Sequence, residues 1–213
     1  MPSKTNDREY RSLVLSAADE PGKMIVRGFA TTFSQPYRLW YNDEIELREQ
    51  VLRSAFDETD MADVIMQYDH MGRVFARRKN GTLRLEVTDE GLAIEADLGG
   101  TDIGRQLYEE IRGGYTDKMS YGYTLTDDGA DEEYLGTENG RKIYLRTVKR
   151  IAKLYDVSAV SLPANDNTSI SARSAFDGVI ERVTAERLEA QRIETERLRT
   201  IVRARAKGVK NDY

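Results

Sequence analysis

The sequence contains no cysteine and only one histidine among its 213 residues. The absence of cysteine excludes disulfides, thiolate catalysis and zinc sites built on thiolates, and it is compatible with a reducing compartment. A single imidazole excludes metal sites that need several histidines, so only carboxylates remain as ligands for hard cations. We therefore expect neither a bound metal nor another cofactor.

Long apolar runs are also missing. No run approaches the roughly 20 residues needed to cross a membrane, and residues 1–12 (MPSKTNDREYRS) lack the apolar stretch of a secretory signal. The formal net charge is -5 at pH 7, which argues against a general nucleic-acid binder, because such proteins are basic. We expect a cytosolic protein that binds neither membranes nor nucleic acid.

Most of the chain from Tyr10 onward has the pattern of β-strands. Apolar residues alternate with polar ones over residues 83–87 and 92–98, which predicts strands with one buried and one wet face. The Asn-Gly pair at 80–81 and the Glu-Gly pair at 90–91 favour hairpin turns between such strands. Residues 24–33 form a more continuous apolar strand.

Two helices are expected within this β region. Residues 49–58 favour a short one. Residues 101–112 predict a clearer one, in which Thr101 caps the first turn and a Gly-Gly pair ends the last. The acidic, glycine-containing residues 127–140 predict an exposed loop between two strands.

A long charged helix is predicted over residues 174–206, which are dense in Glu and Arg and lack a regular apolar heptad. Its basic end suits the negative end of the helix dipole, or else serves as an arm that binds a partner. The predicted organisation is a disordered N-terminus (1–9), a β domain (10–170) and a charged helical extension (171–213).

The stretch KMSYGYTL, residues 118–125, is the first of three candidate functional segments. Its alternation directs Met119 and Tyr121 to one face and Ser120 to the other. Gly122 leaves the Ser120 face open, where a substrate backbone could approach closely. The alternative is that Ser120 is an ordinary hydroxyl on the polar face of an antiparallel strand.

The lone imidazole, His70, follows an acidic and aromatic run at the end of a predicted strand. Asp156 interrupts a half-apolar strand, and a carboxylate buried there needs a partner. Each has a simpler explanation: His70 as a structural residue, and Asp156 as an edge residue or the partner of an arginine. Asp69 is a rival acid, although it points away from His70 if the strand continues through it.

Together the three residues form a known chemical set. A serine hydroxyl needs a base to act as a nucleophile, an imidazole is suited to that task, and a carboxylate orients the imidazole. The order His70, Ser120, Asp156 is no objection, because a triad is defined by geometry. No G-x-S-x-G elbow is present, which argues against an α/β-hydrolase. We expect His70 and Ser120 on adjacent strands.

Three blocks of the sequence resemble the signature blocks of the tailed-phage prohead protease family. They read VIMQYDHMGRVFARRKN…GLAIEADL, GYTDKMSYGYTL and IAKLYDVSAVSLPAND, and they occur in order over roughly residues 10–170. The opening VRGFATTF also resembles the first core strand of that family.

This resemblance implies that His70 is the base, Ser120 the nucleophile and Asp156 the orienting acid. The family more often has glutamate at the third position, so Asp156 reaches less far by one methylene. No oxyanion hole is readable from the sequence; main-chain N–H groups could form it, and Arg146 or Arg150 is a candidate donor.

The family is similar in fold to the herpesvirus assemblins. The expected fold is therefore mainly β with helices (α+β): a small closed or partly open β-barrel wrapped by short helices, plus the C-terminal helix.

The implied function is that of a serine endopeptidase of phage capsid maturation. It would act inside the prohead in the host cytoplasm, cleaving the scaffold or the scaffold-like segment of the major capsid protein, with self-cleavage. A homo-oligomer is a further expectation. Two alternatives remain: a catalytically inactive, protease-like scaffold or assembly chaperone, and a β-barrel binding module in which the three residues are unrelated.

Overall fold

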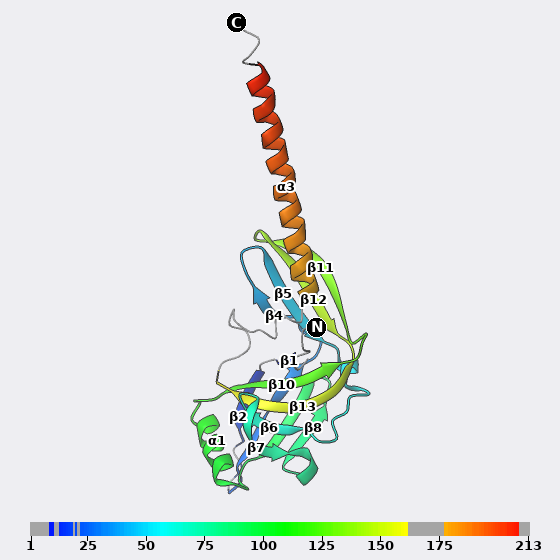
Figure 1. Ribbon diagram of the computed structural model, residues 1–213. Helices are drawn as coiled ribbons and strands as arrows, with labels where there is room; N and C mark the ends of the chain where they lie inside the picture. Colours follow the sequence, from blue (N-terminus) through cyan, green and yellow to red (C-terminus); the bar gives the residue numbers. More distant parts are fainter. Residues whose placement is uncertain (1–8, 11–12, 19, 21, 162–176, 209–213) are drawn as a thin grey trace. The chain divides into compact units, whose positions relative to one another are not determined.

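The computed structural model describes residues 9–10, 13–18, 20, 22–161 and 177–208, and the chain divides into two compact units, residues 1–172 and 173–213 (Figure 1). The predicted disorder of residues 1–9 concerns positions outside the described residues, apart from Glu9, which begins the first strand. The predicted boundary at residue 170 also falls outside them.

The larger of two sheets has nine strands, in the order β7-β6-β13-β10-β2-β3-β9-β8, with β1 paired to β10. Most pairs are antiparallel, but β6 runs parallel to β13. The strands are β1 (Glu9–Tyr10), β2 (Leu13–Ala17), β3 (Ile25–Thr32), β6 (Ile65–Tyr68), β7 (Met71–Arg77), β8 (Leu83–Val87), β9 (Gly91–Asp97), β10 (Lys118–Leu125) and β13 (Ile151–Val160).

The smaller sheet has the order β11-β12-β5-β4, in which β12 and β5 are parallel. Its strands are β4 (Tyr37–Tyr41), β5 (Ile45–Val51), β11 (Ala130–Glu138) and β12 (Arg141–Val148). Two 3₁₀ turns, η1 (Arg53–Phe56) and η2 (Arg78–Asn80), follow β5 and β7.

The prediction of a mainly β fold with helices is confirmed, whereas the barrel is not. The pairing of the larger sheet starts at β7 and ends at β8, and over the described residues no strand pair joins these two ends. The sheet is therefore open by its hydrogen bonding, and the closed or partly open barrel stays a prediction.

Two local predictions are wrong. Residues 49–58 do not form one continuous helix, because β5 continues to Val51 with alternate residues buried, and only Arg53–Phe56 is helical, as the 3₁₀ helix η1. Residues 127–140 are not a loop, because β11 occupies 130–138 and pairs with β12 along its length. The residues of β11 are exposed or half-buried, so its acidic sequence suits an outer strand of the sheet.

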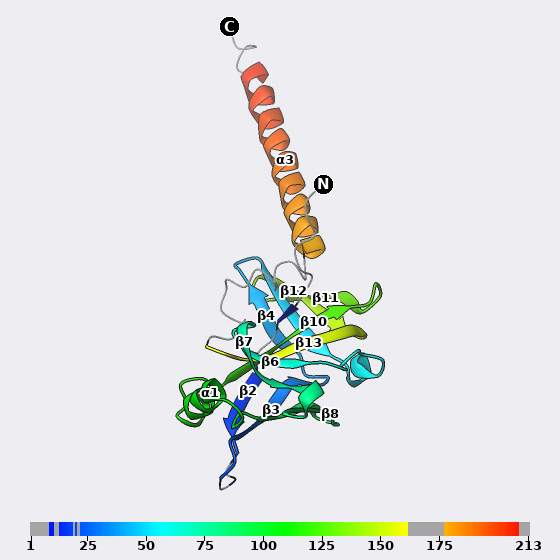
Figure 2. The same cartoon turned by 60° about the horizontal axis from the view of Figure 1, so that its bottom comes forward.

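The helix α1 (Asp102–Arg112) is confirmed, including its cap, since the Thr101 hydroxyl accepts a hydrogen bond from the Gly104 N–H at 3.1 Å. The helix packs against β2, β3 and β7 (Figure 2). Gly104 permits this approach, because a Cβ there would lie 2.2 Å from the carbonyl oxygen of Leu98. The buried Leu107 and Ile111 join the main hydrophobic core.

The second unit contains α3 (Asp177–Gly208), close to the predicted helix over residues 174–206. Four large apolar side chains of α3 are exposed: Leu188, Ile193, Leu198 and Ile201. Both interpretations of the basic end of α3 stay open, because the side chains from residue 202 onward lie outside the described part of the structure. Over the described residues, no helix has the length and apolar character needed to cross a membrane.

Candidate active site

The three candidate residues lie on or next to neighbouring strands of the larger sheet, with β13 between β6 and β10. Ser120 on β10 is directly opposite Ser158 on β13, and Gly122 is opposite Asp156. Directly opposed residues share a face, as do residues two apart in one strand. Ser120, Asp156 and Ser158 therefore lie on one face of the sheet.

The other face of these strands belongs to the hydrophobic core, where Met119, Tyr121, Val157 and Ala159 are buried. The predicted alternation of β10 is therefore confirmed: the large apolar side chains point one way and Ser120 the other. The expectation that His70 and Ser120 lie on adjacent strands is wrong, because β13 separates β6 from β10.

His70 occupies the tight turn between β6 and β7, which pair through Tyr68 and Met71. Asp69 has φ 47° and His70 has φ 58°. Positive φ at both central residues is the pattern of a type I′ hairpin turn, which most side chains adopt only at a cost. The strand therefore does not continue through Asp69, and His70 is held by the turn.

Asp69 fixes this turn to the end of β13. Its N–H donates to the Ala159 carbonyl at 2.9 Å, and its carboxylate accepts from the N–H and the hydroxyl of Ser161 at 3.0 and 2.8 Å. These bonds offset the unfavourable backbone conformation. Asp69 is therefore a structural residue and not the rival acid considered from the sequence.

The base of the same hairpin is held by a second carboxylate. The Arg77 Nε–H donates to Asp63 Oδ1 at 2.7 Å. This hydrogen bond lowers the pKa of the Asp63 carboxyl and raises the pKa of the Arg77 guanidinium. The β6–β7 hairpin that carries His70 is thus tied down at both ends.

His70 and Asp156 are in direct contact. The Nδ1 atom of His70 is 2.5 Å from Asp156 Oδ1, and the two side chains are 13% and 1% exposed. Since a carboxylate only accepts, the hydrogen lies on Nδ1, which leaves Nε2 as the nitrogen that can accept a proton. The shorter aspartate side chain therefore reaches the imidazole in this structure.

Ser158, which the sequence analysis did not single out, gives Asp156 a second hydrogen bond. Its buried hydroxyl donates to the same Oδ1 atom at 2.7 Å. In the described part of the chain, Asp156 Oδ2 has no hydrogen-bond partner, so both bonds that orient the carboxylate meet at one oxygen. Its position two residues after Asp156 could have identified Ser158.

Ser120 lies in the same row of side chains but is not hydrogen-bonded to the pair. It is 2% exposed, and its Oγ atom has no hydrogen-bond partner among the residues that the structure describes. Diagonal neighbours across an antiparallel pair are about 7–8 Å apart, which is the relation of Ser120 to Asp156. The structure thus joins His70 to Asp156 directly and places Ser120 beside them on the sheet.

The two arginines considered as oxyanion donors have partners elsewhere. Arg146 lies on β12 of the smaller sheet, with Nη1 3.3 Å from Glu49 Oε2. Arg150 pairs with Asp128. Over the described residues, no cluster of side chains suited to hold a metal ion is found.

Replacing Ser158 by alanine should lower kcat at least about tenfold with little change in KM, because a hydrogen bond to a charged group contributes about 1.5–3 kcal/mol. We expect the loss in kcat, because Ser158 would act on the reaction only through its hydrogen bond to Asp156. Steady-state kinetics with a peptide substrate would measure it, together with the pH profile of kcat. An unchanged kcat and pH profile would contradict this role.

A comparison with known protein families matches the part of the chain that holds the candidate site. The family model described as caudovirus prohead serine protease matches residues 11–180, which include all three candidate residues. Neither the curated proteins nor the solved structures gave a match.

Proposed function

This chain belongs to the caudovirus prohead serine protease family, and from that premise we propose that it is a serine endopeptidase of capsid maturation. The observation that carries the proposal is the 2.5 Å contact between His70 and Asp156, on the sheet face that also holds Ser120. A histidine paired with a buried carboxylate beside a serine is the arrangement that serine proteases use.

In the proposed mechanism, Ser120 Oγ attacks the scissile carbonyl carbon while His70 Nε2 takes the hydroxyl proton. The imidazolium is stabilised by Asp156, and it then gives the proton to the leaving amine, which breaks the peptide bond. A water molecule, activated by the same nitrogen, hydrolyses the acyl-enzyme and releases Ser120. Each residue in this scheme is a proposed catalytic residue.

The proposed substrates are the scaffold or the scaffold-like segment of the major capsid protein, cleaved inside the prohead in the host cytoplasm, with self-cleavage. Membership of the family supports these substrates and this place of action. A homo-oligomer, a barrel and a fold similar to that of the assemblins stay predictions. Incubating the purified chain with the cognate capsid protein and measuring fragment masses would test the choice of substrate.

The alternative proposal is an inactive, protease-like scaffold or assembly chaperone, or a binding module in which the three residues are unrelated. A serine-directed phosphonate separates it from the enzyme. We expect labelling of Ser120, identified by peptide mapping, and loss of that label in Ser120→Ala. The exposed Ser54 provides a control, because Ser54→Ala should label like the wild type. Labelling at no serine would favour the inactive alternatives.

Residues 171–213 are proposed to be a targeting or scaffold-like extension that can be removed. The exposed Leu188 and Ile193 of α3 support a contact with another chain. Changing both to aspartate should reduce the amount of protein incorporated into proheads while peptide cleavage is kept. The exposed polar Gln191 gives the control, Gln191→Asp. Equal incorporation of both variants would contradict the targeting role.

A further inference from the structure

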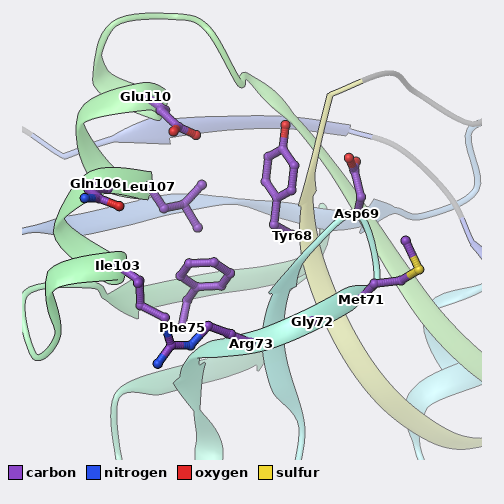
Figure 3. Close-up of a pocket in the computed structure, with 10 residues that line it drawn as sticks. All are labelled: Tyr68, Asp69, Met71, Gly72, Arg73, Phe75, Ile103, Gln106, Leu107 and Glu110. Carbon is purple, nitrogen blue, oxygen red and sulfur yellow. The ribbon is translucent and has the colours of Figure 1, made fainter.

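The turn that carries His70 has little packing to hold it. Met71, which follows His70, is 71% exposed, and the first four residues of β7 are exposed. On the α1 side of the turn lies a cavity of about 530 Å³, and Tyr68, Asp69 and Met71 help to line it (Figure 3). The hydrogen bonds of the turn are therefore its main constraint, because packing contributes little there.

Three side chains form a hydrogen-bonded group at this turn: Tyr68, Asp69 and Ser161. We call this group the Asp69 latch. The Asp69 carboxylate accepts from the N–H and from the hydroxyl of Ser161, at 3.0 and 2.8 Å. Because that hydroxyl donates to Asp69, it accepts from the Tyr68 hydroxyl, which is 2.7 Å away. Figure 3 shows the Tyr68 hydroxyl and the Asp69 carboxylate pointing the same way. The latch thus ties the two residues before His70 to the end of β13.

The anchor of the latch and the acid of the site belong to one segment of the chain. Ser161 directly follows β13, and Asp156 lies within that strand. Strand β13 is hydrogen-bonded on both sides, to β6 and to β10, and such central strands are the last parts of a fold to open. The latch therefore fixes His70 relative to the same strand that holds Asp156.

We propose that Asp69 is a positioning residue for the hydrolytic reaction, because its latch keeps the His70 imidazole in contact with Asp156. This inference rests on the proposed function, in which the held imidazole takes the proton of Ser120. Asp69 and His70 both have positive φ, a conformation that persists only where the surroundings determine it. A displacement of about 1 Å at a catalytic group can lower a rate by about a hundredfold. A hydrogen-bonded group near the surface can therefore have a large effect on kcat.

Asp69→Gly separates the latch from the backbone conformation, because glycine adopts positive φ without cost but has no carboxylate. If the backbone alone positioned His70, this variant would keep the activity of the wild type. We expect instead that kcat for peptide cleavage falls about ten- to hundredfold with little change in KM. Asp69→Asn keeps an acceptor oxygen and tolerates the same backbone conformation, so it should recover most of kcat.

The position of the imidazole can also be followed without an activity assay. His70 is the only histidine, so isotopic labelling of histidine gives the NMR signals of a single imidazole. In the wild type, the hydrogen-bonded Nδ1–H should give a downfield proton signal that exchanges slowly with water. Asp69→Gly should weaken this signal, and Asp69→Asn should restore it. Ser161→Ala should weaken it too, and should add little to Asp69→Gly, because both remove the same hydrogen bond.

Asp63→Ala is the matched control. It removes a carboxylate from the other end of the same hairpin, where Asp63 accepts from Arg77 at 2.7 Å. This variant should keep kcat and the imidazole signal near those of the wild type. Thermal unfolding of every variant shows whether the fold is kept. If Asp69→Gly does not fold, Ser161→Ala carries the test, with the same expected direction of change in kcat and in the signal.

Phosphonate labelling of Ser120 is measured in parallel. If the wild type is labelled but the folded latch variants keep both kcat and the imidazole signal, this inference alone is overturned. The same holds if Asp63→Ala lowers both as much as Asp69→Gly does. Absence of labelling in the wild type overturns the proposed function and the inference with it.

Discussion

Replacing Ser120 or His70 by alanine is expected to lower kcat for peptide cleavage by a factor of about 10³ or more, and the double variant should lose little further activity. The reason is that the two side chains serve one step: without the base the hydroxyl keeps its proton, and without the hydroxyl the base has no proton to take. Single-turnover kinetics of the three variants against the wild type would measure the effect.

The control for this set of single and double variants is Asp156→Asn, which should lower kcat less than either single alanine change. Asparagine keeps the size of the side chain and still accepts a hydrogen bond from Ser158, so the fold should remain intact. Thermal unfolding of all four variants would separate a loss of chemistry from a loss of structure. Near-additive losses for Ser120 and His70 would show that they do not act in one step.

Replacing Glu49 by alanine should lower the free energy of unfolding by about 3–5 kcal/mol. Glu49 is fully buried on β5, where the Tyr37 hydroxyl donates to Oε1 at 2.5 Å and Arg146 lies 3.3 Å from Oε2. The alanine variant removes the carboxylate that faces a buried guanidinium, and a buried charge that loses a partner is strongly destabilising. Urea unfolding would measure the change.

Two further variants show whether burial is the cause. Asp131→Ala breaks the exposed ion pair with Lys149 on the same sheet and should have a much smaller effect. The double variant Glu49→Leu with Arg146→Met replaces both charges with apolar groups and should recover much of the lost stability. If Asp131→Ala and Glu49→Ala cost the same, burial does not decide the contribution of this pair.

The buried pair of Glu49 and Arg146 also explains why the helix over residues 49–58 was wrongly predicted. Glu49 reads as a surface residue in the sequence, but a partner about a hundred positions away on β12 allows it to be buried in a strand. Local propensity cannot contain that information, because the compensating charge arrives only through tertiary pairing. The helix at 101–112 was predictable because its cap and its apolar period are both local.

The candidate site was predictable in its members but not in its arrangement. Alternation in β10 and β13 indicates which face each side chain occupies, so Ser120 and Asp156 could be assigned to the face opposite the large apolar side chains. The alternation of residues along a strand does not indicate which strands are neighbours in the sheet. The place of β13 between the two other strands, and the bond from Ser158 to Asp156, follow from pairing across the fold.

The central place of β13 also affects when the site can exist during synthesis. This strand, residues 151–160, is the last of the larger sheet to be made, yet it hydrogen-bonds to both β6 and β10. A nascent chain that ends before it carries His70 and Ser120 but has neither Asp156 nor the strand that joins them. Pairings of such long sequence separation form late and slowly. The proposed hydrolytic activity therefore depends on completion of the β domain, and incomplete chains on the ribosome lack it.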